Sequence, residues 1–143
     1  MANSKDVVVT GVSTGIGWGT TKVLVSKGFR VFGSVRKQAD ADRLQREFGD
    51  GFVPLVMDIT DADAVHQAAQ KVGSIIGDRN LVGLVNNAGV VVSGALLYLR
   101  PSEYRRQLEV NMISPLVVNL PESWCSLMRL RRRLRGPAPI SRA

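Results

Sequence analysis

The chain of 143 residues contains a single cysteine, Cys125, and this scarcity limits the sites that it can build. One cysteine cannot form a disulfide within the chain, nor a metal site that needs several thiolates. The first residues, Met1 to Asp6, are polar and lead directly into an apolar run. No secretory signal is visible in them, and we expect a cytoplasmic location.

Charge is missing altogether from residues 80–99, a segment about long enough to span a bilayer. Its middle, however, contains Asn86, Asn87 and Gly89. Side-chain amides are costly to bury in lipid, and glycine weakens a helix. We therefore expect a strand followed by a loop here, and no membrane partner.

Acidic residues are absent after Glu122, although the same stretch holds six arginines, at positions 129, 131, 132, 133, 135 and 142. The net charge is +7, so the rest of the chain carries only about +1 and offers no basic face for nucleic acid. We divide the chain into a domain at 1–120 and an arginine- and proline-rich tail at 121–143. The tail is expected to be disordered or to come from another reading frame or exon, although a short basic helix that binds nucleic acid remains an alternative.

Apolar runs that suit strands alternate along the chain with segments of helical periodicity. The strands are expected at 7–10, 29–35, 52–57 and 81–85, and the helices at 16–27, around Leu44 and Phe48, from Thr60 to Ile76 and from about Ser102. Such alternation predicts an α/β fold with a doubly wound parallel sheet of the Rossmann type, incomplete at its carboxyl end. Pro54 places the third strand at or near an edge.

Two details of the helices are also predicted. The first helix should pack Ile16, Thr20, Val23 and Leu24 against the sheet, because they share one helical face. The third should begin at a capping box, Thr60 to Asp63, and pack Val65, Ala69, Val72 and Ile76 against the core.

A glycine-rich turn follows the first strand, with Gly11, Gly15 and Gly17 spaced as G-x-x-x-G-x-G. These glycines permit a tight turn, close approach of an anion to the backbone, and near contact between helix and strand. The amides of the helix's first turn would then bind a pyrophosphate. A turn that binds nothing is the alternative when the glycines are taken alone.

Polar or flexible residues stand at the ends of all four strands, where ligands of parallel sheets bind. They are the glycine-rich turn, Arg36, Asp58 and the run Asn86-Asn87-Ala88-Gly89. Agreement among four strand ends favours a binding site over a set of unrelated turns.

Several of these segments together resemble the short-chain dehydrogenase/reductase family over roughly residues 5 to 118. Thr10 to Gly17 matches T-G-x-x-x-G-I-G, Asn86 to Gly89 matches N-N-A-G, and Glu109-Val110-Asn111 matches the segment with the family's active-site asparagine. The resemblance implies that Asp58 meets the adenine ring and that Asn111 is catalytic. It implies cofactor contacts at Gly11, Ser13, Gly15, Ile16, Gly17, Arg36, Asp58, Asn87, Ala88 and Gly89. Read without the family, Asp58 could simply start a turn, and Asn111 could be a solvated helix position.

The choice of cofactor depends on the end of the second strand, where an acid would favour NAD. Arg36 and Lys37 stand there instead. Because a guanidinium can bind a phosphate through two N–H groups, we expect NADP, with NAD possible, and the alternative is a solvated basic turn.

The family's chemistry is hydride transfer between a nicotinamide and a small carbonyl or alcohol substrate, with a tyrosine and a lysine four residues later in proton transfer. Neither Tyr98 nor Tyr104 is followed by such a lysine. The chain is therefore expected to be an inactive cofactor-binding half of an oxidoreductase, or a non-catalytic dinucleotide-binding module. An unpaired edge on the fourth strand also predicts self-association.

Overall fold

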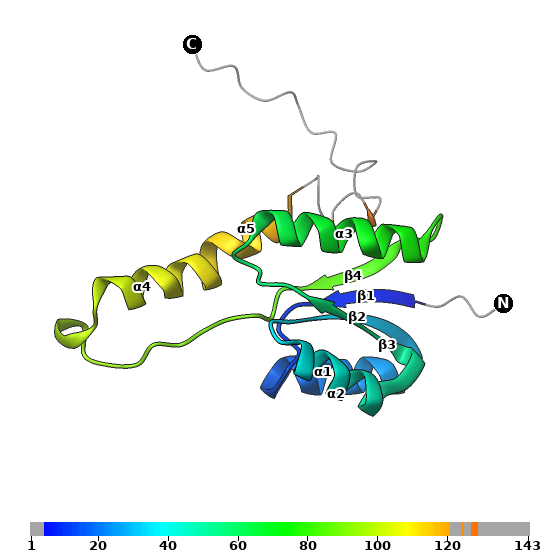
Figure 1. Ribbon diagram of the computed structural model, residues 1–143, viewed down its shortest axis with the longest axis horizontal. Coiled ribbons are helices and arrows are strands. Elements are labelled where there is room, and N and C mark those ends of the chain that lie inside the picture. Colours follow the sequence, from blue (N-terminus) through cyan, green and yellow to red (C-terminus); the bar gives the residue numbers. More distant parts are fainter. Residues whose placement is uncertain (1–4, 121–123, 125–126, 129–143) are drawn as a thin grey trace, which may run out of the picture.

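The fold is a four-stranded parallel sheet between two layers of helices, seen in a computed structural model that describes residues 5–120, 124, 127 and 128 (Figure 1). The strands are β1 (Lys5–Val9), β2 (Phe29–Val35), β3 (Phe52–Val56) and β4 (Leu81–Val85), and they lie in the order β3-β2-β1-β4. All the pairings are parallel. The predicted Rossmann-type sheet is therefore confirmed, and Pro54 does lie on an edge strand.

Helices cover both faces of this sheet. Figure 1 shows α1 (Gly15–Ser26) and α2 (Gln38–Phe48) on one face, and α3 (Ala62–Ile76) and α5 (Ser114–Val118) on the other. Between β4 and α5 the chain forms α4 (Pro101–Leu108) and a π-helical turn, η3 (Glu109–Ile113). Short 3-10 turns occupy Gly49–Gly51 and Leu96–Tyr98.

The core is split by the sheet into two apolar clusters, as alternating side chains on a strand require. Val7 and Val9 of β1 pack in the cluster beneath α1 and α2, whereas Val8 packs in the cluster beneath α3. The stripe predicted on α3, Val65, Ala69, Val72 and Ile76, is buried in the second cluster. Burial of β1 on both faces explains why its sequence is a continuous apolar run.

The predicted packing face of α1 is wrong in two places. Ile16 is 82% exposed and Val23 is 53% exposed, while Gly17 and Thr21 are the buried positions of this helix. The reason is the close approach of α1 to the preceding turn at Gly17, which rotates the packed face away from the most apolar side chains.

The predicted start of α3 is displaced by one residue. Asp61, not Thr60, caps the helix, because its carboxylate accepts a hydrogen bond of 3.0 Å from the N–H of Ala64. The Thr60 hydroxyl instead donates to Asp58 Oδ1 at 2.8 Å. Asp58 and Thr60 are thus bonded to each other in the loop between β3 and α3.

The sequence predicts one helix from about Ser102 onward, whereas the structure has three consecutive elements there, α4, η3 and α5. Pro115 explains the break, because proline has no N–H to donate and its ring clashes with the carbonyl four residues earlier, that of Asn111. The chain widens into the π turn, and the Ser114 hydroxyl donates to the Glu109 carbonyl at 2.9 Å.

Most of the predicted tail, residues 121–143, lies outside the described residues. Trp124, Leu127 and Met128 are described, and they pack against the cluster beneath α3, with Trp124 fully buried. Apolar contacts of the domain therefore continue past residue 120. Among the described helices, none has the length and apolar character needed to cross a membrane.

A buried ion pair holds the opposite end of the sheet from the strand ends discussed above. The Asp6 carboxylate on β1 is fully buried and lies 2.7 Å from Nε of Arg30 on β2. The other oxygen of Asp6, Oδ2, lies 3.7 Å from Nη1 of Arg79, a residue in the loop just before β4. One carboxylate thus joins β1 to β2 and to the loop that precedes β4.

We expect Asp6→Ala to lower the free energy of unfolding by about 3 kcal/mol, because it leaves the largely buried Arg30 cation without its partner. Urea denaturation measures this loss, with Asp50→Ala in an exposed turn as the control. A midpoint equal to that of the control would show that the pair contributes nothing to stability.

Candidate functional site

The site is built around Thr10, which joins the carboxyl ends of β1 and β4. Its buried Oγ1 accepts hydrogen bonds from the N–H groups of Asn87 and Ala88, both at 3.0 Å, and lies 3.4 Å from the Val85 carbonyl. The Asn87 side-chain amide returns the link by donating to the carbonyls of Thr10 and Gly11, at 3.0 and 2.9 Å. The strand order reverses between β1 and β4, so the loops that follow these two strands diverge and leave a crevice between them.

The glycine-rich turn is fixed from two other elements. The N–H of Gly11 donates to Ser34 Oγ of β2 at 2.9 Å, and the N–H of Val12 donates to the Ser34 carbonyl at 3.0 Å. From α2, Arg43 donates to the Ser13 carbonyl at 2.6 Å. The turn is therefore held in place before any ligand arrives, which lowers the entropy cost of binding.

Two glycines of the turn are required by close contacts. A Cβ on Gly17 would collide with the Gly11 carbonyl oxygen and the Asn87 side-chain amide. Gly11 has φ +70°, and a Cβ there would lie 2.7 Å from the Ala88 backbone. The helix, the turn and the loop after β4 thus meet at a point with no room for side chains.

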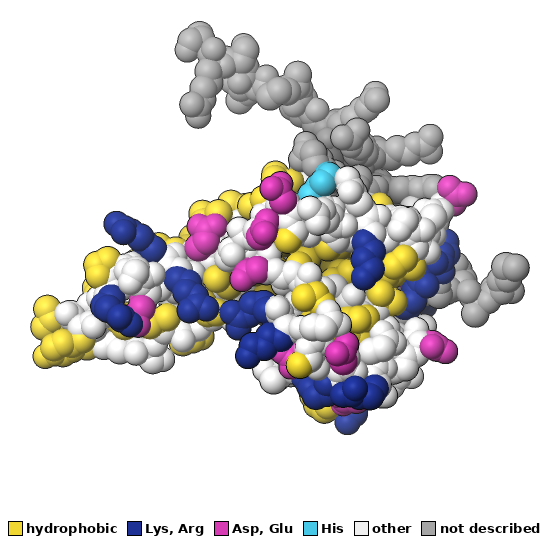
Figure 2. Space-filling model, in the orientation of Figure 1, with side chains coloured by type: hydrophobic (Ala, Val, Ile, Leu, Met, Phe, Trp, Pro, Cys, Tyr) yellow, Lys and Arg dark blue, Asp and Glu magenta, His cyan; other side chains and the backbone are white. Residues whose placement is uncertain are grey.

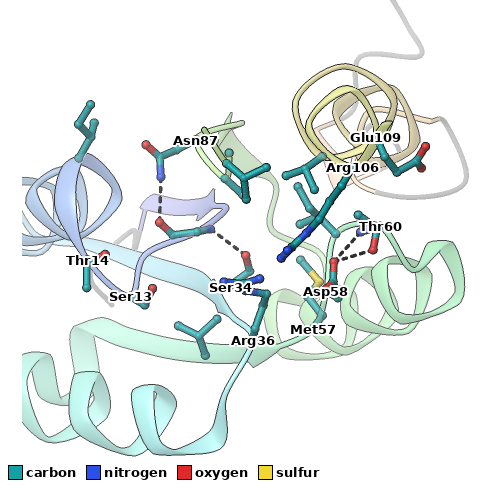
Figure 3. A pocket seen from close by; sticks show the side chains of 18 residues that line it. Ser13, Thr14, Ser34, Arg36, Met57, Asp58, Thr60, Asn87, Arg106 and Glu109 are labelled. Atoms are coloured by element: carbon teal, nitrogen blue, oxygen red, sulfur yellow. Dashed lines mark hydrogen bonds between the residues drawn. The ribbon is translucent and has the colours of Figure 1, made fainter. Parts of the chain in front are cut away.

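A cavity of about 520 Å³ opens beside this junction (Figure 3). Such a volume is within the range of sites for small molecules and cofactors. The predicted residues that line it are Gly11, Ser13, Ile16, Arg36, Asp58, Asn87, Ala88 and Gly89. The predicted residues Gly15, Gly17 and Asn111 are not part of its lining.

Asp58 contributes an ionised carboxylate to the cavity. Its Oδ1 accepts hydrogen bonds from the Thr60 N–H, at 2.9 Å, and from the Thr60 hydroxyl. Asp58 therefore does start a turn, as expected when it is read without the family. The backbone hydrogen bond from Thr60 lowers the pKa of Asp58, with smaller contributions from Arg36 and Arg106. Oδ2 has no hydrogen-bond partner among the described residues and remains available as an acceptor.

Asn111 does not line the cavity, but it is bonded to Val90, which does. Its side chain accepts the N–H of Val90 at 2.9 Å and donates to the Val90 carbonyl at 2.8 Å. This pair of bonds fastens the loop after β4 to the π turn. Asn111 is exposed but not merely solvated.

Sequence reasoning missed two arginines that act here. Arg43 braces the turn, and Arg106 of α4 lines the cavity. Figure 3 shows the Arg106 side chain extending into the pocket, whereas the carboxylate of Glu109 is turned away. No local pattern identifies either residue, because each reaches the site from a helix far along the chain.

Comparison with known proteins agrees with this geometry. Residues 5–129 match the short chain dehydrogenase family. The chain belongs to the short-chain dehydrogenase/reductase family. The match extends past Val118, where the motif resemblance ends.

Members of the short-chain dehydrogenase/reductase family with similar sequences include an NADPH-dependent 3-dehydrocapnine reductase of Ornithobacterium rhinotracheale, 39% identical over 117 residues. This alignment covers 82% of our chain and 41% of that reductase. A probable NADP-dependent dehydrogenase of Dichelobacter nodosus is 43% identical over 89 residues, which cover 62% of our chain and 82% of that protein.

Among solved structures, a 3-ketoacyl-(acyl-carrier-protein) reductase of Brucella melitensis, complexed with NADH, has a TM-score of 0.74 and 29% identity. The likeness covers 80% of our chain and 46% of that structure. The chain thus spans less than half the length of these two reductases.

We expect Gly17→Ala to destabilise the domain by about 1–3 kcal/mol, because the added methyl must displace backbone or the Asn87 amide. Gly19→Ala is the matched control in the same helix, since a Cβ there has nothing within 4 Å. The control should instead stabilise by about 0.5–1 kcal/mol. Equal midpoints of thermal or urea unfolding for the two variants would contradict the close contact.

Proposed function

We propose that the chain binds NADP in the cavity at the carboxyl ends of the strands, as the cofactor-binding half of an oxidoreductase. The observation that carries this proposal is the Arg36 guanidinium at the end of β2. It lines the cavity, is exposed, and makes no ion pair or hydrogen bond among the described residues. A cation left unpaired in a cavity is suited to an anionic ligand group.

The start of α1 fits the pyrophosphate of such a ligand. No side chain caps this helix at Thr14, and its first turn has no acidic residue. In contrast, Asp61 caps α3. The first N–H groups of α1 therefore remain available, in a turn whose glycines keep side chains away from the backbone.

The 2′-phosphate and the adenine ring of the ligand would also meet suitable groups in the cavity. Arg36 would bind the 2′-phosphate that distinguishes NADP from NAD, and NAD, which lacks it, would bind more weakly. The free Oδ2 of Asp58 would accept a hydrogen bond from the adenine amino group. Asn87, Ala88 and Gly89 would border the ligand on the β4 side.

The oxidoreductase part of the proposal rests on the family and on named relatives, one of them described as NADPH-dependent. A bound nicotinamide would supply hydride chemistry toward a carbonyl or alcohol carbon. The chain's own contribution is positional, since Asn111 holds Val90 and so fixes the loop beside the cavity. The sequence of this chain contains no tyrosine with a lysine four residues later, which keeps the non-catalytic binding module as the second candidate.

Self-association stays a prediction of the same proposal. β4 forms one edge of the described sheet, and Val82 on it is 58% exposed. An exposed apolar edge is a template for pairing with another chain.

We expect Arg36→Asp to lower the ratio of NADP to NAD affinity by about tenfold or more, because it replaces a charge-assisted hydrogen bond with repulsion. Calorimetric titration with both dinucleotides measures the ratio. Arg46→Asp, an exposed position on α2 outside the cavity, makes the same change in net charge as a control. An unchanged ratio in Arg36→Asp would remove Arg36 from the site.

We expect the purified chain of 143 residues to show no turnover of alcohols or carbonyls. It lacks the pair of a tyrosine and a lysine four residues later that would transfer the proton, and loss of such a group slows catalysis by orders of magnitude. Spectrophotometry of the reduced nicotinamide measures the rate. Cofactor-dependent turnover of about one per second or faster would contradict the expectation.

A further inference from the structure

A second arginine enters the cavity from the wall opposite the glycine-rich turn. Arg106 lies on α4, lines the cavity, and is exposed. Like Arg36, it makes no ion pair or hydrogen bond among the described residues, whereas Arg100 on the same helix is paired with Glu103 at 3.0 Å. Figure 2 shows Lys and Arg side chains gathered where the α4 arm meets the rest of the molecule.

Arg36 and Arg106 converge on the same end of the cavity. Both are close enough to Asp58 to help lower its pKa, although neither forms an ion pair with it. The Oδ1 of that carboxylate is already occupied by Thr60. The other acid in the lining, Glu109, turns its carboxylate away from the pocket (Figure 3). Two guanidinium groups from different elements thus face a space into which the carboxylate of Asp58 points, whereas that of Glu109, the other acid of the described lining, does not.

This arrangement fits a doubly charged ligand group better than a singly charged one. Like charges held near each other repel, and the repulsion is relieved when a dianion lies between them. A phosphate monoester carries about −1.5 to −2 charge near neutral pH and offers three acceptor oxygens. Two guanidinium groups on separate walls can therefore bind it together, each through two parallel N–H donors.

We infer that Arg106 is a second binding residue for the 2′-phosphate of NADP, which it contacts from α4 while Arg36 contacts it from β2. This inference rests on the proposed function, because it assigns a further residue to the same site. It also gives α4 a role in cofactor selection.

Phosphate binding by Arg106 should also change the mobility of α4, which a surface charge acting at a distance would not do. This helix has no buried residue, and Figure 1 shows it extending away from the sheet. A phosphate bound between Arg36 and Arg106 would tie α4 to the rest of the domain. Its amide hydrogens should then exchange more slowly when the ligand carries a 2′-phosphate.

Binding of 2′,5′-ADP and of 5′-AMP to the full chain, measured by calorimetry, isolates the 2′-phosphate. We expect Arg106→Gln to weaken 2′,5′-ADP about tenfold and to leave 5′-AMP unchanged, because only the former loses a charge-assisted contact. Arg105→Gln is the matched control, since this neighbour on α4 removes the same charge but does not line the cavity. Hydrogen exchange of α4 should slow with 2′,5′-ADP in wild type and not in Arg106→Gln.

Three outcomes would overturn the inference in distinguishable ways. If wild type binds both nucleotides equally, the proposed preference for NADP fails, and the inference fails with it. If wild type prefers 2′,5′-ADP but Arg106→Gln retains that preference, the inference alone is wrong. If Arg106→Gln weakens both nucleotides equally, Arg106 contacts the adenosine part or supports the fold, and not the 2′-phosphate. Urea midpoints of the variants, expected to match wild type, separate these last two causes.

Discussion

The link between Thr10 and Asn87 is the constraint on which the rest of the site depends. One buried hydroxyl accepts two backbone N–H groups from the loop after β4, and one side-chain amide donates back to two carbonyls of the glycine-rich turn. Without these bonds, the N–H groups of Asn87 and Ala88 and the carbonyls of Thr10 and Gly11 would lose these partners in a partly buried junction. These bonds fix the distance between the two loops, and that distance determines the width of the crevice between them.

The charges around the cavity follow from the same arrangement. Because the sheet is parallel, the ends of β2 and β3 lie beside the crevice and bring Arg36 and Asp58 to its wall. The π turn brings in α4 from the other side, with Asn111 bonded to Val90 at its base. The cavity thus brings two unpaired guanidinium groups and the ionised Asp58 carboxylate close to the start of α1, and this set of groups supports the proposed binding of a phosphorylated adenine nucleotide.

Much of this fold could be predicted because it depends on local patterns. The strands 29–35 and 81–85 have the predicted bounds, and the stripe on α3 is buried as its period requires. Contacts between distant segments could not be read in the same way. The packed face of α1 depends on the meeting of Gly17 with Asn87, and the positions of Arg43 and Arg106 depend on how their helices cross the site. Trp124 is buried although Glu122, Ser123 and Ser126 close to it in sequence are polar.

The central claim is that a dinucleotide lies in the cavity between the glycine-rich turn and the loop after β4. Backbone NMR of the labelled chain during titration with NADP tests it most directly, because each amide reports its own surroundings. The account predicts saturable shifts at residues 11–17, 34–36, 58–60 and 87–90, with little change on the outer faces of α2 and α3. The absence of shifts at these four segments, or shifts confined to other surfaces, would contradict it.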